Sequence, residues 1–134
     1  MIKEQYIHSE ITAEILSVAF EVHKTIGPGF MESVYKKAML VECSLRNIET
    51  DSEIDFPVFY KNIKVGSRRA DIVIKKKVIV ELKAVTELND THLAQAINYL
   101  EAFNLDVGLL LNFGSKSLQY KRIIHPKILN QKNQ

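Results

Sequence analysis

The sequence contains one cysteine, no tryptophan and only three prolines among its 134 residues. A single thiol cannot form an internal disulfide, which excludes the disulfide-stapled folds of small secreted domains. No apolar run approaches the roughly 20 residues that a membrane-spanning helix needs. The first ten residues, MIKEQYIHSE, also lack the apolar segment of a signal peptide. We therefore expect a cytoplasmic protein that has no membrane partner.

What is present is typical of an ordinary globular chain. Hydrophobic residues make up 46% of the sequence, charged residues make up 25%, and the net charge is +2. This length suffices for one hydrophobic core, so we expect a single domain over residues 1–134 with a polar tail that frays from about residue 127. Basic residues gather in the central third of the chain, where they could bind phosphates. They are Lys61, Lys64, Arg68, Arg69, Lys75, Lys76 and Lys77.

Apolar residues at helical spacing predict three helices. The first covers about residues 9–26 and is ended by Gly27-Pro28-Gly29, because proline cannot continue the hydrogen-bond ladder. The second covers about residues 30–45, and the third begins at Asn89 or Asp90 and ends near Phe103. For the second helix we expect the buried stripe to be Met31, Val34, Ala38, Val41 and Leu45.

Strand-like runs account for most of the remaining chain. Pro57 lies within one of them, which indicates an edge strand or a bulge because proline cannot donate a ladder hydrogen bond. The run after the third helix is apolar on consecutive residues, which favours a buried strand reached by a parallel crossover. The expected strands cover residues 54–60, a return from 63, a hairpin within 69–85, then 106–112 and 118–124. We therefore predict an α/β fold of three layers, in which helices flank a mixed central β-sheet.

The hairpin within residues 69–85 carries charged side chains into a buried region. Two β-branched runs, 72–74 and 78–80, flank three lysines. If the lysines form the loop, Asp71 lies opposite Glu81, and Lys83 points to the same face because strand side chains alternate. Like charges on directly opposed residues, with Cβ atoms roughly 4.5 to 5.5 Å apart, are destabilising. A divalent cation held by the two carboxylates is the simplest arrangement that removes this repulsion.

Two alternatives stay open for this hairpin. Three-residue hairpin loops prefer a glycine at the left-handed position, which the lysines do not supply. A slip of one residue would send Asp71 and Glu81 to opposite faces of the sheet. Asp71 could also simply begin a strand, while Glu81 and Lys83 form a surface ion pair that binds nothing.

Further candidates lie on two of the helices. Glu32 and Tyr35 are three residues apart and therefore neighbours on the second helix. They could instead be a glutamate stabilised by the helix dipole and a tyrosine at the edge of the core. On the third helix, His92, Gln95 and Tyr99 form one line. That line could face water, or it could face the carboxylates, where Gln95 could orient a water and His92 could contact a phosphate or transfer a proton.

Several of these stretches, taken in order, resemble known families. Asp71 followed by Glu81-Leu82-Lys83 resembles the signature of the PD-(D/E)xK nuclease superfamily. The stretch GFMESVY at residues 29–35 is similar to the name motif of the small bacterial GxxExxY proteins. The resemblance covers roughly residues 10 to 125. Ala70 stands where the signature has proline, and Arg68 stands where family members often carry tyrosine. The stretches that carry the resemblance to these families also include Arg69-Ala70-Asp71, VIVELKAV at 78–85, HLAQ at 92–95, Tyr99-Leu100 and LNFG at 111–114.

This resemblance implies a restriction-endonuclease-like fold and a set of roles. Asp71 and Glu81 would bind the metal, with Glu32 added from a helix. Lys83 would position the attacking water, while Gln95 resembles part of a QxxxY helix that packs beside the metal. Catalytic roles would fall to Glu32, Lys83 and Gln95. Supporting or substrate-binding roles would fall to Tyr35, Arg69, His92 and Tyr99.

The function implied by the resemblance is a metal-dependent nuclease that hydrolyses phosphodiester bonds with Mg²⁺ or Mn²⁺. Its partner would be nucleic acid, with DNA favoured over RNA. The alternative is a nucleic-acid-binding or protein-interaction module that keeps the nuclease fold without cutting. Asp71→Asn separates the two, because it would abolish cleavage in the first case and leave binding intact in the second. Whether the chain forms a homodimer stays open.

Overall fold

The central element of the chain, in a computed structural model that describes residues 7–128, is a mixed β-sheet of five strands. The strands lie in the order β1-β2-β3-β4-β5; the β3–β4 pair is parallel and the other pairs are antiparallel. The elements are α1 (Ser9–Ile26), α2 (Glu32–Leu45), β1 (Thr50–Tyr60), β2 (Ile63–Ile74), β3 (Val78–Lys83), α3 (Asp90–Phe103), β4 (Val107–Asn112) and β5 (Gln119–Ile124).

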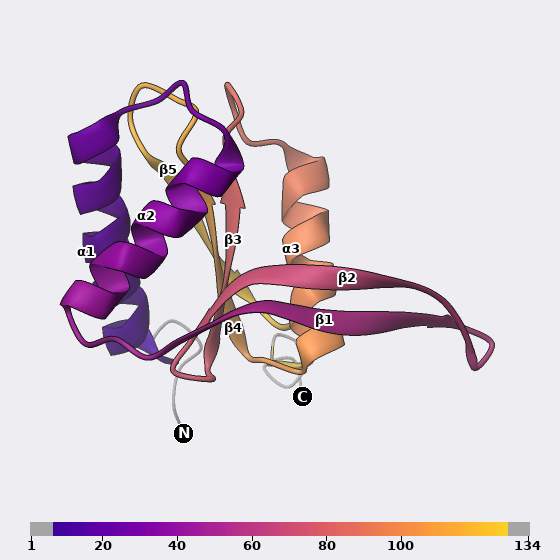
Figure 1. Ribbon diagram of the computed structural model, residues 1–134. Coiled ribbons are helices and arrows are strands. Elements are labelled where there is room, and N and C mark those ends of the chain that lie inside the picture. Colours follow the sequence, from indigo (N-terminus) through magenta and orange to yellow (C-terminus); the bar gives the residue numbers. More distant parts are fainter. Residues whose placement is uncertain (1–6, 129–134) are drawn as a thin grey trace.

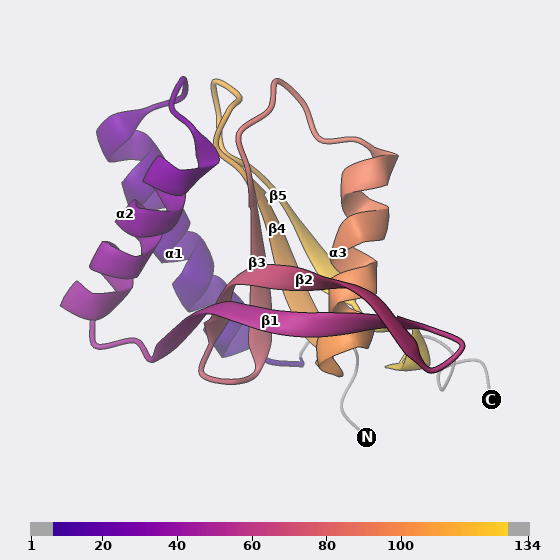
Figure 2. The same cartoon turned by 45° about the vertical axis from the view of Figure 1, so that its right-hand side comes forward.

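Helices cover both faces of this sheet (Figure 1). α1 and α2 lie together on one face and α3 lies on the other, as the turned view in Figure 2 also shows. Two clusters of buried apolar side chains match this arrangement, the larger under α1 and α2 and the smaller under α3. The predicted three-layered α/β fold is therefore confirmed, including the parallel crossover made by α3. Among residues 7–128, no helix combines the length and the hydropathy that crossing a bilayer requires.

The β2–β3 hairpin has the register that the sequence favoured. Ile72 pairs with Val80 and Ile74 pairs with Val78, so the three lysines form the connection. The lysines supply the left-handed conformation themselves, because Lys75 and Lys76 have φ angles of 53° and 58°. The N–H of Lys77 closes the turn by donating to the carbonyl of Ile74 over 3.0 Å. The absence of glycine therefore did not prevent this loop.

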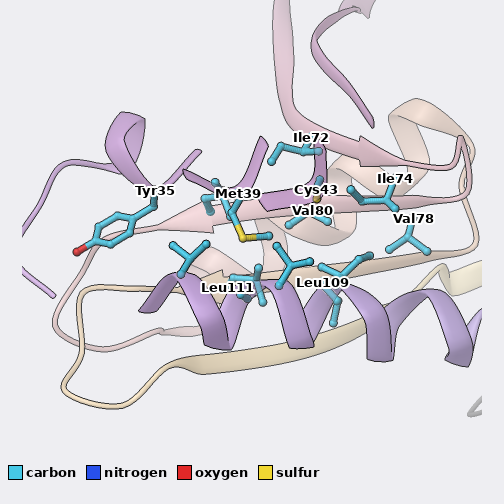
Figure 3. Close-up of a cluster of buried hydrophobic side chains, with 14 of the residues drawn as sticks. Tyr35, Met39, Cys43, Ile72, Ile74, Val78, Val80, Leu109 and Leu111 are labelled. Atoms are coloured by element: carbon cyan, nitrogen blue, oxygen red, sulfur yellow. The ribbon is translucent and has the colours of Figure 1, made fainter. Parts of the chain in front are cut away.

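The core between the sheet and the first two helices is built from side chains of α1, α2 and the strands, and Figure 3 labels those from α2, β2, β3 and β4. β3 and β4 are buried on both faces, which explains why their apolar residues are consecutive. The labelled side chains all belong to one buried cluster. They are Tyr35, Met39, Cys43, Ile72, Ile74, Val78, Val80, Leu109 and Leu111.

The prediction for the buried face of α2 was wrong. The residues that α2 buries are Tyr35, Met39 and Cys43, which are spaced four apart. Four of the five residues expected in the core are exposed, among them Met31 at 75% and Leu45 at 74%, and Ala38 is only partly buried at the edge of the core. Both faces of this helix are apolar, so periodicity alone could not decide which one meets the sheet.

The β1–β2 hairpin is much longer than its contact with the rest of the sheet. β1 pairs with β2 from Thr50 to Tyr60, whereas β3 pairs with β2 only as far as Ile72. The outer part of the hairpin extends past α3 (Figure 1). β1 is an edge strand, and its pairing shifts between Val58 and Phe59, in agreement with the edge or bulge that Pro57 predicted.

The basic residues of the central third do not form one patch. Lys61 lies at the tip of the β1–β2 hairpin and Lys64 near it, whereas Lys75, Lys76 and Lys77 lie at the opposite end of β2. Ten residues of extended strand, 65–74, separate Lys64 from Lys75, a span of up to about 35 Å. Lys75 is also paired with Glu14 of α1 over 2.8 Å. The tertiary structure therefore divides a cluster that is continuous in the sequence.

The chain after β5 is held to the body at residue 127, where the frayed tail was expected to begin. Residues 126–128 form a short helical turn. The Lys127 ammonium donates to Asn104 Oδ1 over 3.1 Å and lies 3.4 Å from an oxygen of Asp106. The remainder of the predicted tail, residues 129–134, lies outside the described residues.

A glycine after β4 sets how closely two loops can approach. A Cβ at Gly114 would lie 2.4 Å from the carbonyl oxygen of Val85, 2.5 Å from its nitrogen and 2.6 Å from the carbonyl carbon of Ala84. These are backbone atoms, which cannot swing away as a flexible side chain would. We expect Gly114→Ala to lower the free energy of unfolding, measured by urea denaturation, by about 1–3 kcal/mol or more. Gly66→Ala is the control, because a Cβ there meets nothing within 4 Å; equal losses in both variants would contradict this expectation.

Candidate functional site

Two carboxylates meet where β2 leaves β3. The backbone pairing of the two strands ends at Ile72 and Val80, one step before Asp71 and Glu81. Beyond that step the side chains connect the strands. The N–H of Asp71 donates to Glu81 Oε1 over 3.4 Å, and the N–H of Leu82 donates to Asp71 Oδ2 over 2.8 Å. The predicted convergence of the two acids is therefore observed, with carboxylate oxygens taking the place of ladder carbonyls.

Burial makes both acids hard to ionise, and the charge of Asp71 adds to this effect at Glu81. Glu81 is only 6% exposed, and burial, followed by the charge of Asp71, raises its pKa to about 8. The hydrogen bond from Asp71 and the charge of Lys83 lower that pKa in part. The pKa of Asp71 is also raised, chiefly by burial and against the lowering effect of the Leu82 N–H. Without a cation, negative charge at this site is therefore unfavourable.

Lys83 and helix α3 complete one side of the site. The ammonium of Lys83 donates to Gln95 Oε1 over 3.3 Å, which places both side chains together at the end of β3. Tyr99, one turn further along α3, has a raised pKa, mainly through burial and then through the charge of Glu81. Arg68 lies over the Tyr99 ring at 5.6 Å from its centre. The line of side chains on α3 therefore faces the carboxylates at Gln95 and Tyr99.

The start of α2 approaches the site from the other side of the sheet. Glu32, the first residue of α2, lines an open cleft of about 520 Å³ together with Lys83 and His92. Its charge also contributes to the raised pKa of Glu81. Glu32 is exposed, whereas Asp71 and Glu81 are more deeply placed. The structure therefore places Glu32 at the rim of the paired acids.

Tyr35 has a supporting position inside the protein. Its side chain is fully buried and stacks on Phe113, with ring centres 4.7 Å apart. Its hydroxyl donates to the carbonyl of Gly27 over 2.6 Å and accepts from the N–H of Phe30 over 3.2 Å. Tyr35 therefore fixes the loop that leads into Glu32, and its burial excludes the direct contact with substrate that an exposed tyrosine could make.

A buried asparagine fixes the loop on the opposite side of Lys83. Asn112 is fully buried and lies beside Lys83 in the parallel β3–β4 register. Its Oδ1 accepts from the N–H of Val85 (2.9 Å) and of Gly114 (3.0 Å). Its Nδ2 donates to the carbonyl of Val85 (2.9 Å) and to Gln119 Oε1 (3.0 Å). Sequence reasoning assigned Asn112 no role, although a polar residue ending an apolar strand was the available signal.

Two other expected site residues have their side chains engaged elsewhere. Arg69 forms a bidentate ion pair with Asp55 on the exposed hairpin, with hydrogen bonds of 2.8 and 3.2 Å. His92 accepts from the N–H of Asn89 over 3.1 Å as part of the capping box of α3, while its ring also lines the cleft beside Glu32. Lys36 of α2, which sequence reasoning did not select, lies near enough to lower the pKa of Asp71.

The residues present fit a hard divalent cation. Across residues 7–128, no group of three or more His, Cys, Asp and Glu side chains is close enough to hold one ion together. Asp71 and Glu81 nevertheless supply two oxygen ligands whose repulsion a cation would relieve. Mg²⁺ is commonly held by one or two carboxylates, and the rest of its coordination comes from water and substrate phosphates. The chemistry of this donor set therefore suits Mg²⁺ or Mn²⁺ rather than a thiolate-seeking metal.

The fold and the site together define an α/β protein with paired acids and a lysine at the end of a central strand. The sequence matches the PD-(D/E)XK nuclease superfamily over residues 9–123, and the chain belongs to that superfamily. Among curated proteins, no sequence match is found. The fold is similar to the crystal structure of SSO0001, with a TM-score of 0.51 and 18% identity over 95% of this chain and 86% of that one. At this identity the likeness concerns the fold alone.

The raised pKa of Glu81 makes stability depend on pH. Between pH 4.5 and about pH 8, the Glu81 side chain keeps its proton in the folded protein, whereas in the unfolded chain it has released that proton. In EDTA we therefore expect the free energy of unfolding to fall as the pH rises from about 5 to 8, measured by urea denaturation. Glu81→Gln should reduce this fall, and Glu101→Gln, on the exposed side of α3, should not. An identical pH profile for wild type and Glu81→Gln would refute this assignment.

Proposed function

We propose that this protein is a metal-dependent nuclease that hydrolyses phosphodiester bonds of nucleic acid. The observation that carries the proposal is the meeting of Asp71 and Glu81 beside Lys83 at the end of a central strand. Membership of a nuclease superfamily supports the same reaction class. The GFMESVY stretch further supports a place among the GxxExxY proteins, and its buried tyrosine has a structural role that explains part of that motif.

Asp71 and Glu81 would hold Mg²⁺ or Mn²⁺. A divalent cation bound there supplies positive charge to a phosphate oxygen and lowers the pKa of a coordinated water. A cation there would favour the ionised form of both carboxylates, since its charge would oppose the burial that raises both pKa values and the repulsion by Asp71 that adds to it at Glu81. Glu32 does not form a group with the two acids that is close enough to hold one ion, so from the rim its charge would act on the metal without binding it directly.

Lys83 would orient the attacking water and offset the negative charge that develops on the phosphate. Gln95 holds the ammonium of Lys83 through a 3.3 Å hydrogen bond, which limits where that charge can lie. Gln95 would also share in placing the water. His92, which lines the cleft with Glu32 and Lys83, would contact a phosphate, and Tyr99 would pack beside the metal.

The competing function is a module that binds nucleic acid without cutting it. The exposed lysines of the β1–β2 hairpin favour it, because they can bind phosphates without any help from the carboxylates. This function predicts that Asp71→Asn binds nucleic acid at least as tightly as wild type and that wild type cuts nothing.

We also propose a homodimer and DNA as the preferred substrate. Met31, Val34, Val41 and Leu45 are exposed on one side of α2, and with the partly buried Ala38 between them they follow alternating spacings of three and four, the pattern of paired helices. A second copy would cover this stripe. Light scattering before and after Val41→Glu tests the dimer, and a panel of DNA and RNA substrates tests the preference.

Metal binding should be visible as stability. Because metal binds the folded protein, the free energy of unfolding should rise by about 2.7 kcal/mol at a Mg²⁺ concentration 100 times the Kd. Thermal melting with Mg²⁺, and separately with Mn²⁺, measures this gain. The double variant Asp71→Asn/Glu81→Gln should melt at the same temperature with and without metal. Equal shifts in wild type and in this variant would place the metal elsewhere.

Cleavage should depend on the same residues. Wild type, Asp71→Asn and Lys83→Ala are incubated with DNA and RNA and either metal. We expect both variants to lose activity by about 100-fold or more, since each removes a group that stabilises charge in the transition state. Asp71→Asn relieves repulsion in the metal-free protein, so its melting temperature should not fall, which separates lost chemistry from lost folding. Full activity in either variant would reject the proposed roles.

A further inference from the structure

The outer part of the β1–β2 hairpin, residues 56–68, forms an arm that has no sheet partner beyond its own two strands. Pairing between β2 and β3 ends at Ile72, so this part is a two-stranded ribbon. Its tip exposes large side chains, with Phe59 60%, Tyr60 63%, Ile63 68% and Val65 62% exposed. A soluble protein normally covers such side chains, and their concentration in one place indicates a binding surface.

The charge of the arm has one sign. From residue 56 to residue 68 the sequence contains Lys61, Lys64 and Arg68 but no Asp or Glu. Asp55, the acid just before the arm, is paired with Arg69 over 2.8 Å. Within residues 7–128, neither Lys61 nor Lys64 forms an ion pair with a carboxylate. The arm therefore presents lysines together with exposed aromatic rings, and Lys61 lies 5.5 Å from the centre of the Tyr60 ring.

One face of the arm leads to the paired acids. Tyr60 is paired with Ile63 and Phe56 with Arg68, and side chains two residues apart on a strand share a face. At the inner end of that face, Phe56 lies 5.3 Å from the Phe103 ring. Arg68 lies over Tyr99, whose pKa the charge of Glu81 raises. A polymer lying along this face would extend from the tip towards the carboxylates.

We propose that the arm binds an unpaired stretch of nucleic acid and leads it to the site at Asp71 and Glu81. Lys61, in the turn at the tip, and Arg68, on the same face as Tyr60 and Phe56, would contact phosphates, and a base would stack on the ring of Tyr60. The stacking argues for an unpaired strand, because a duplex hides the faces of its bases and leaves only edges and phosphates exposed. This inference rests on the proposed nuclease function for its destination, but its binding step needs neither metal nor cleavage.

Charge also decides against a second copy of the chain as the occupant of the arm. Two arms placed together would bring lysines against lysines, and residues 56–68 offer no acid to pair with them. A polyanion satisfies the same surface, because each lysine can replace a counterion on a phosphate.

The test is binding of labelled single-stranded DNA and RNA in EDTA, measured by fluorescence anisotropy at several salt concentrations. The arm variant is Lys61→Gln/Arg68→Gln, because Lys64 is paired with Phe59 and lies on the other face of the ribbon. Its control is Lys76→Gln/Lys77→Gln, which removes equal charge at the opposite end of β2 and likewise alters one lysine of positive φ. We expect the arm variant alone to reduce the slope of log affinity against log salt, by about 1.4 for two phosphate contacts.

Stacking is tested at Tyr60. We expect Tyr60→Ala to weaken binding of a single strand by about tenfold or more and Tyr60→Phe to leave it nearly unchanged. Binding of a matched duplex should be weaker than that of the single strand and insensitive to Tyr60→Ala. Equal effects of the arm and control variants, or a duplex bound as tightly as the single strand, would overturn the proposal. So would light scattering that shows a dimer dissolved by Tyr60→Ala.

The outcomes of this binding test can be told apart from the outcomes of the cleavage test. If the arm variant loses affinity while wild type cleaves nothing, the arm is supported and the nuclease function is rejected. If wild type cleaves and Asp71→Asn does not, but the arm variant binds and cuts as wild type does, the nuclease function stands and the arm is rejected.

Discussion

The structure depends on the short pairing of β2 with β3, which brings two carboxylates together in a region that water hardly reaches. Three residue pairs join these strands, and the next residues along each are Asp71 and Glu81. The β-branched residues on both strands bury the hairpin and thereby set the low polarity around Glu81. The cost of this arrangement is visible in the raised pKa values of both acids. Under the proposed function a cation would stabilise this site, and folding and metal binding would then be coupled.

The surrounding loops are held by buried polar groups rather than by chance packing. Tyr35 fixes the approach to Glu32 through the carbonyl of Gly27, and Asn112 fixes the loop after Lys83 through both polar groups of Val85. Both side chains are completely buried, which strengthens their hydrogen bonds and makes the loss of either partner costly. The exposed end of the site is therefore supported by a rigid scaffold, which is what precise placement of a lysine and a carboxylate requires.

The divergence of β2 from β3 has two consequences at once. It ends the ladder where the carboxylates take over the hydrogen bonds, and it frees the outer hairpin to extend past α3 (Figure 1). Arg68, over the ring of Tyr99, lies where the free hairpin joins the site. Strand β2 thus runs from the arm into Asp71, so a ligand on the arm would be positioned relative to the acids with little additional flexibility.

The sequence by itself determined the order of the elements and favoured the register of the central hairpin in which Asp71 meets Glu81, the register that the structure has. These features depend on local patterns, since two β-branched runs around three lysines permit few registers and a slip would expose apolar residues. Only the tertiary structure decided which face of α2 is buried, because that helix has apolar residues on both sides and the choice depends on what the sheet presents to it. It also decided that Lys61 and Lys75 lie far apart, because the extended strand β2 between them places them at opposite ends of its length.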